Sequence, residues 1–141
     1  MGAGTIEFYA CYPHFHLDDV DYWDVKRITR KLIEHKLNIV CFTPEQCLYP
    51  VNIAALDPAA RKRSMDVFKK SIQFGAEMGT EYVVTLAGYG TLDEEESAAW
   101  KRSVESLGIL GDMAESYGVK LVLETSPREY TPPIIPKTWY V

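Results

Sequence analysis

The chain has 141 residues, of which 47% are hydrophobic and 25% are charged, and its formal net charge is −5 at pH 7. This length and balance predict one globular domain with a core of its own. The acidic balance argues against a nucleic-acid partner, because phosphate binding needs clustered Lys and Arg, and the richest basic run, Arg61-Lys62-Arg63, covers only one helical turn.

The cysteines indicate a reducing compartment. Cys11, Cys41 and Cys47 are odd in number and lack CxxC spacing, which is typical of reduced thiols rather than of a disulfide framework. No signal peptide is evident, and no apolar run is long enough to span a bilayer. We therefore expect a cytoplasmic protein that does not contact a membrane.

Strands and helices are predicted to alternate along the chain. Runs rich in apolar, β-branched and aromatic residues predict strands at 5–11, 38–43, 81–87 and 119–124. Three helices are predicted between them: over 22–35, from Asp57-Pro58 to Gly79, and from the acidic run 93–96 to Gly118. This alternation is typical of an α/β protein with a parallel sheet and right-handed crossovers.

The helical spacing of apolar residues also predicts which face of each helix is buried. Asp18, Asp19 and Asp21 are candidate N-caps for the first helix. The expected buried stripes are Val25, Ile28, Leu32 and Ile33; then Met65, Phe68, Ile72 and Ala76; then Trp100, Val104, Leu107, Leu110, Ala114 and Tyr117.

Two closures of the sheet are compatible with this pattern, an open doubly wound sheet and a (β/α)8 barrel. A full barrel needs roughly 250 residues, so the predicted strands and helices amount to about half of one. No G-x-G-x-x-G follows the first strand, which leaves a dinucleotide-binding fold unsupported. The proline-rich segment 130–141 fits neither closure, because its prolines exclude a helix. We expect a partial barrel over 1–129 and a separate tail over 130–141.

The last predicted strand leads directly into a carboxylate. Val119 to Leu123 precede Glu124, and Thr125-Ser126-Pro127 then end the strand. Parallel α/β folds carry their chemistry at the carboxyl ends of their strands. A charge buried there needs a partner, for instance a metal ion. The spacing leaves two interpretations open: Glu124 is a functional carboxylate, or it is the first solvated residue beyond the strand.

Seven short motifs, spread over nearly the whole chain up to Glu129, carry a family resemblance. They are Tyr12-Pro13-His14, Phe42-Thr43-Pro44-Glu45, Tyr49-Pro50-x-Asn52, Arg63-x-x-x-x-Phe68, Ala87-Gly88-Tyr89-Gly90, Trp100-x-Arg102 and Leu121-Val122-Leu123-Glu124. With these motifs the chain resembles the sugar-phosphate isomerase/epimerase family with the xylose-isomerase-like TIM barrel. Within that family it is most similar to the fructoselysine 3-epimerases and ketose 3-epimerases.

The resemblance implies a half TIM barrel and an enzyme that binds a divalent metal, Mn²⁺ or Mg²⁺ with Zn²⁺ or Co²⁺ as alternatives. In such enzymes two carboxylates move a proton of a ketose through an enediolate. Glu124 then corresponds to a metal ligand and to one of the proton-transfer carboxylates. The resemblance also implies a sugar or a sugar phosphate as the substrate.

The resemblance assigns substrate contacts to His14, Glu45, Tyr49 and Glu129. His14 fits a surface loop equally well, and Glu45 and Tyr49 also fit an exposed loop with one packed aromatic. Glu129 lies five residues after Glu124, where the family spacing is six. Trp100 fits the buried stripe of its helix better than a wall of the substrate site.

The departures from the family pattern limit what this chain is expected to do alone. The family's barrel has one strand before the segment that begins at Thr5, and three strand–helix units after Glu124 that carry the Asp, His and second Glu of the metal site. One ligand of four does not hold a metal tightly, so we expect no tight metal binding and no turnover.

Two other readings remain from the sequence. One is a non-catalytic half-barrel that forms a homo-oligomer or pairs with another chain, because an open parallel sheet exposes unpaired edges. The other is a metal-dependent endonuclease of the same superfamily, which three histidines and an acidic balance disfavour.

Overall fold

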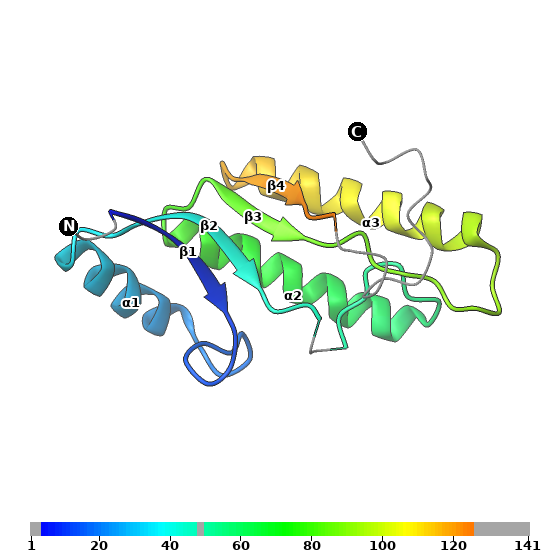
Figure 1. The fold of residues 1–141 in the computed structure, drawn as a ribbon, viewed down its shortest axis with the longest axis horizontal. Coiled ribbons are helices and arrows are strands. Elements are labelled where there is room, and N and C mark those ends of the chain that lie inside the picture. The colour runs from blue at the N-terminus through cyan, green and yellow to red at the C-terminus, as the bar shows by residue number, and fades with distance from the viewer. Residues whose placement is uncertain (1–3, 48–49, 126–141) are drawn as a thin grey trace.

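The computed structural model describes residues 4–47 and 50–125, and the predicted alternation of strands and helices is confirmed (Figure 1). Along the chain the elements are β1 (Thr5–Ala10), α1 (Tyr22–Glu34), β2 (Asn38–Pro44), α2 (Pro58–Glu77), β3 (Tyr82–Thr85), α3 (Glu96–Ser116) and β4 (Lys120–Leu123). The termini of the strands differ from the sequence prediction, most clearly for β3, where pairing covers only the middle of the predicted strand 81–87.

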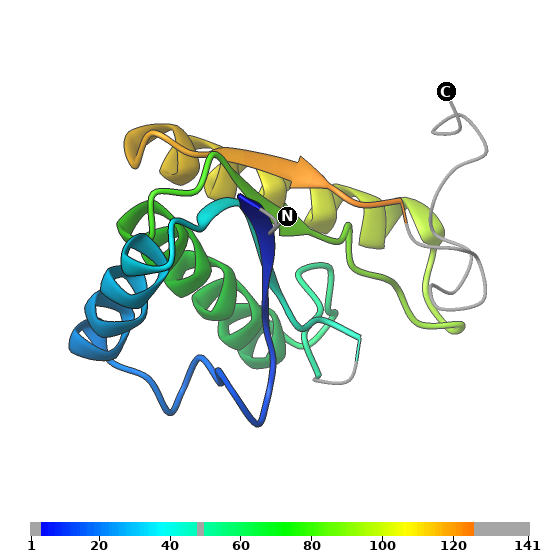
Figure 2. The same cartoon turned by 60° about the vertical axis from the view of Figure 1, so that its left-hand side comes forward.

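The strands form one parallel sheet in the order β1-β2-β3-β4. Because the crossovers follow the sequence order without reversal, right-handed connections place every helix on the same face of the sheet. Figures 1 and 2 show α1, α2 and α3 gathered on that one face. A doubly wound sheet would reverse its order at a switch point, so the partial barrel is confirmed.

The opposite face of the sheet is not covered by any described helix. In β1 the side chains of Ile6, Phe8 and Ala10 pack into the helix-covered core, whereas Glu7 and Tyr9 are exposed. The hydroxyl of Thr43 donates a hydrogen bond of 2.5 Å to the Glu7 carboxylate and so links β2 to β1 on the uncovered side. In a closed barrel this face would line the interior.

The core lies between the sheet and the three helices, with most of its helical residues on α2. Phe15 stacks edge-on against Phe8, Phe42 and Phe74, with ring centroids 5.1–6.1 Å apart. The predicted α2 stripe is confirmed, with Met65, Phe68 and Ile72 buried and Ala76 packed against the cluster. Burial of this apolar surface is the main stabilising contribution to the fold.

Three residues of the predicted stripes are exposed instead. Ile33 follows Leu32 by about 100° around the helix, so only Leu32 reaches the core. Tyr117 caps α3 beyond its last turn and is 45% exposed. Val104 is 49% exposed because Ser103 and Ser106 take the inward positions and donate hydrogen bonds to the carbonyls of Ala87 and Ile53.

The first two helices begin at the N-cap residues that the sequence offers. Of the three candidate aspartates, Asp21 is the N-cap of α1, and it forms a reciprocal capping box with Asp24. Asp57 accepts a hydrogen bond from the Ala60 amide at the start of α2, with Pro58 in the first helical position.

Several further sequence predictions concern the thiols, membrane contact and the tail. Cys11, Cys41 and Cys47 are free thiols. Across the described part of the chain, no helix has the length and hydropathy needed to cross a membrane. The predicted boundary at 129/130 and the tail 130–141 lie outside the described residues and stay predictions.

The close approach of α2 to the sheet generates a stability prediction. A Cβ at Gly75 would lie 2.9 Å from the Thr80 methyl, 3.0 Å from a Val83 methyl and 3.3 Å from the Phe42 Cβ. Gly75→Ala is therefore expected to lower the free energy of unfolding by about 1–3 kcal/mol in urea titrations.

Gly108→Ala is the matched control, because a Cβ at this α3 position meets nothing within 4 Å. It should raise the free energy of unfolding by about 0.5–1 kcal/mol, since alanine has the higher helix propensity. Equal effects of the two substitutions would contradict the packing of α2 on β2 and β3.

Candidate functional site at the carboxyl edge of the sheet

The carboxyl ends of the four strands lie along one edge of the sheet, from which the connecting loops emerge (Figure 1). At this edge Glu124 directly follows β4, and its amide donates a 2.9 Å hydrogen bond to the Thr85 carbonyl. Leu121 packs against the core, so the alternation of side chains places Glu124 with Lys120 and Val122 on the uncovered face. Glu124 itself is exposed.

Glu45 directly follows β2 and is buried, with only 3% of its surface exposed. Its amide donates to the carbonyl of Ala10, which extends the pairing of β2 with β1. One carboxylate oxygen accepts a 2.6 Å hydrogen bond from the Cys47 amide. The exposed-loop interpretation is thus wrong for Glu45, because the turn after β2 folds back over its side chain.

Cys47 connects the two carboxylates electrostatically. Partial desolvation raises the pKa of its thiol, and the negative charges of Glu45 and Glu124 raise it further. Glu45 follows β2 and Glu124 follows β4, so both carboxylates lie at the carboxyl edge of the sheet. Cys47 was not predicted as a site residue, since its lack of CxxC spacing gave it no signal.

Of the remaining predicted substrate contacts, only His14 lies among the described residues. His14 is exposed, and its Nε2 lies 2.7 Å from the carbonyl oxygen of Tyr9, so its contacts hold it against the end of β1. Its ring also meets the edge of Phe8. Tyr49 and Glu129 lie outside the described residues. Trp100 is half-buried in α3.

Asn52 links the loops that follow β2 and β3. Its amide nitrogen donates to the Tyr89 carbonyl at 2.8 Å, and its oxygen accepts from the amides of Tyr89 and Ala54 at 3.0 and 2.9 Å. Gly88 has a φ of +75°, and a Cβ there would lie 2.6 Å from the Asn52 oxygen. Only glycine therefore allows this close approach.

Arg102 extends the same network from α3. Its Nε donates to the Ala54 carbonyl at 2.7 Å, and its guanidinium pairs with Glu94 at 2.5 Å. The hydrogen bond from Arg102 lowers the pKa of the Glu94 carboxyl. Gln46 adds a third link by accepting from the Leu86 amide at 2.7 Å. Hydrogen bonds thus join the described residues of the loop after β2 to the loop after β3 and to α3.

The described side chains do not form a metal centre. Among residues 4–47 and 50–125, no group of three or more His, Cys, Asp or Glu side chains is arranged to hold a metal ion. The described residues therefore do not fit the metal that the family resemblance implies. A divalent ion at Glu124 would need ligands from elsewhere.

The proximity of Glu124 to Cys47 is testable by thiol chemistry in a Cys11→Ser/Cys41→Ser background. Glu124→Gln removes a negative charge, so it should lower the pKa of Cys47 and increase its alkylation rate at a fixed pH below that pKa. Glu115→Gln removes an exposed carboxylate from the last turns of α3 and should leave the rate unchanged. An unchanged rate in Glu124→Gln would show that the carboxylate is distant from the thiol.

Comparison with known proteins agrees with this geometry. The xylose isomerase-like TIM barrel family model matches residues 1–138. Fructoselysine 3-epimerase of Shigella flexneri is 29% identical over 124 residues, and that of Escherichia coli O157:H7 is 28% identical over the same length. In both cases the match covers 88% of this chain but 45% of the relative. The chain thus spans about half the length of these relatives.

A solved structure described as a D-tagatose 3-epimerase-like protein superposes with a TM-score of 0.77 at 20% identity. The superposition covers 90% of this chain and 46% of that one, and at this identity it supports the fold alone. Because the family model matches nearly the whole sequence, the chain belongs to the xylose isomerase-like TIM barrel family, which includes sugar isomerases and epimerases.

Proposed function

We propose that the chain supplies part of the active-site mouth of a sugar isomerase/epimerase, with Glu124 as a proton-transfer carboxylate. The observation that carries this proposal is the position of Glu124 at the carboxyl end of β4, on the face that would line a barrel. Active sites of (β/α)8 barrels lie at this end of their strands. The relatives named fructoselysine 3-epimerase support a ketose as the substrate class.

The proposed chemistry is removal of the proton on the carbon next to a ketose carbonyl. A carboxylate at the position of Glu124 accepts that proton, and the electron pair moves onto the carbonyl oxygen to give an enediolate. Return of a proton to the opposite face of the same carbon inverts its configuration. That return requires a second acid across the mouth, which the described residues do not provide beside Glu124.

The chain is proposed to bind an open-chain sugar or sugar phosphate and to lack full turnover on its own. The uncovered sheet face and the hydrogen-bonded loops at Asn52 support contacts to only one side of a bound sugar. Glu45 and His14 remain proposed residues of the substrate site. Because the Glu45 side chain is buried, it is proposed to act on the substrate through its neighbours rather than by direct contact. A divalent metal in the assembled site is part of the same proposal.

Solvent exchange measures the half-reaction that one carboxylate supports. In D₂O containing Mn²⁺ or Mg²⁺, we expect slow deuterium incorporation next to the carbonyl of a ketose such as fructoselysine or tagatose, followed by NMR. No epimer should accumulate. Glu124→Gln should reduce incorporation to the uncatalysed background, whereas Glu105→Gln on the exposed side of α3 should not.

Two outcomes would count against this proposal. Exchange that is equal in Glu124→Gln and the wild type would remove Glu124 from the chemistry. Measurable epimer formation that disappears in Glu124→Gln would show that the chain holds a complete site, contrary to the half-mouth proposed here.

A second candidate function is that of a non-catalytic half-barrel that self-associates. The uncovered sheet face favours it, since Tyr9 and Val40 on the strands are 46% and 39% exposed. Within the described strands, β1 and β4 each have one unpaired edge. We expect association by sedimentation velocity, weakened by Val122→Glu on β4 but not by Val104→Glu on exposed α3. A monomer at all concentrations would exclude this candidate.

A further inference from the structure

The uncovered face of the sheet carries a largely apolar strip that crosses all four strands. In each strand one side chain packs into the helix-covered core, and the next one points to the uncovered face. The core residues concerned are Phe8, Phe42, Val83 and Leu121. The residues that follow them, which we call the inner strip, are Tyr9, Thr43, Val84 and Val122. Tyr9 is 46% exposed, and no described helix covers the strip (Figures 1 and 2).

The inner strip is continuous from one edge strand to the other. Tyr9 of β1 pairs with Thr43 of β2, and Val84 of β3 pairs with Val122 of β4. The carboxylates of Glu7 and Glu124 lie exposed on the same face, whereas the Lys120 ammonium on this face is paired with Glu81 at 3.0 Å. An occupant with apolar side chains and a positive charge therefore complements this face.

Residues 126–141 lie outside the described part of the chain, and their composition differs from that of typical solvated tails. Half of the twelve residues in 130–141 have large apolar or aromatic side chains, whereas solvated segments are poor in them. Lys137 is the one charged side chain among these twelve. The large side chains belong to Tyr130, Ile134, Ile135, Trp139, Tyr140 and Val141.

The tail begins beside the inner strip and is long enough to cross it. Glu124 follows β4 directly, and its side chain lies on the uncovered face. Four strands about 4.8 Å apart span about 14 Å. Twelve residues in the extended conformation that proline favours cover about 37 Å, at about 3.1 Å per residue. Residues 130–141 can therefore pass from β4 to β1 without a helix, which their prolines exclude.

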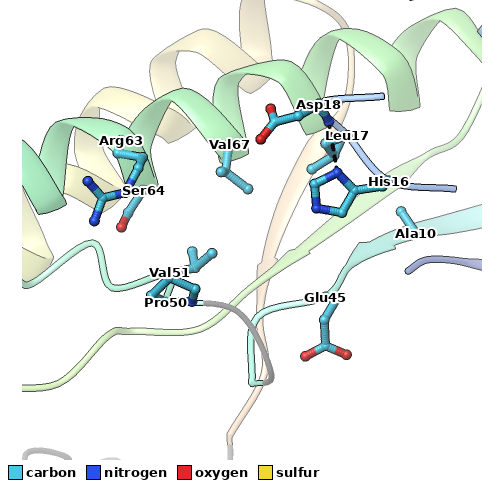
Figure 3. Close-up of a pocket in the computed structure, with 10 residues that line it drawn as sticks. All are labelled: Ala10, His16, Leu17, Asp18, Glu45, Pro50, Val51, Arg63, Ser64 and Val67. Carbon is cyan, nitrogen blue, oxygen red and sulfur yellow. Dashed lines mark hydrogen bonds between the residues drawn. The ribbon is translucent and has the colours of Figure 1, made fainter. Parts of the chain in front are cut away.

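The cavity near the loops after β1 and β2 is too small to hold this segment instead. Figure 3 shows it between these loops and α2, and its volume is about 180 Å³. Glu45 and His16 line it together with Val51 and Val67, so it belongs to the carboxyl edge described above. An apolar cavity of about 150 Å³ in another protein holds one benzene, so this one accommodates one side chain at most.

We propose that residues 130–141 bind the inner strip of their own chain. Their apolar side chains cover the strip, and Lys137 lies beside one of the two exposed carboxylates. Burial of apolar surface on both sides drives the contact. The bound segment restricts access to Glu124 and competes with a second copy for the same face. The contact itself does not depend on any chemistry at Glu124.

Fluorescence of Trp139 tests the proposal in a Trp23→Phe/Trp100→Phe background of the full chain, where it is the one remaining tryptophan. Trp139 should emit at shorter wavelength and be quenched less by acrylamide than in the urea-unfolded chain, at every chain concentration. Val122→Glu places a charge under the apolar segment and should lower the ratio of bound to unbound segment by about tenfold or more, which restores quenching. Tyr9→Ser, at the other end of the strip, should restore quenching in part.

Val104→Glu is the matched control, because Val104 is exposed on α3, and it should leave the quenching unchanged. Circular dichroism melts show that each variant is folded. The proposal is overturned if Trp139 is quenched as strongly in the native chain as in urea, or if Val122→Glu and Val104→Glu have equal effects. Protection that rises with chain concentration would assign the segment to a second copy and overturn it as well. Failure of the Glu124-dependent deuterium exchange would not alter the emission, so the two proposals fail separately.

Discussion

Right-handed crossovers between strands that pair in sequence order are the constraint on which the rest of this structure depends. They place all three helices on one face, leave the other face uncovered, and bring the carboxyl ends of β1, β2, β3 and β4 to one edge. Only this arrangement places Glu124 at the carboxyl edge of the sheet, on the uncovered face. Its immediate sequence alone does not distinguish it from a solvated residue that follows a strand.

The network around Asn52 gives a physical reason for several motifs that carry the family resemblance. Asn52 needs a glycine at position 88 for its close contact with the loop after β3, and Arg102 fixes the Ala54 carbonyl next to it. Asn52, Gly88 and Arg102 have a positioning role, because they hold the loops after β2 and β3 beside the edge that contains Glu124. A rigid mouth reduces the entropy that a sugar would lose on binding.

The sequence predicts the element order, the parallel sheet, the caps at Asp21 and Asp57, and the position of Glu124, because local periodicity and cap chemistry determine all of them. It does not predict the inward serines of α3, since Ser103 and Ser106 are buried by hydrogen bonds to distant loops. The burial of Glu45 and the hydrogen bonds that join Asn52 to the loop after β3 are likewise tertiary properties. No spacing in the sequence encodes them.

The central claim, that Glu124 lies beside the loop after β2 at the carboxyl edge, is tested most directly by a spin label on Cys47 in a Cys11→Ser/Cys41→Ser background. The account predicts strong paramagnetic broadening of the Glu124 and Leu86 amide signals and weak broadening of Asn38 and Lys120, which lie at the amino edge. Broadening that is stronger at Asn38 and Lys120, or absent at Glu124, would contradict it.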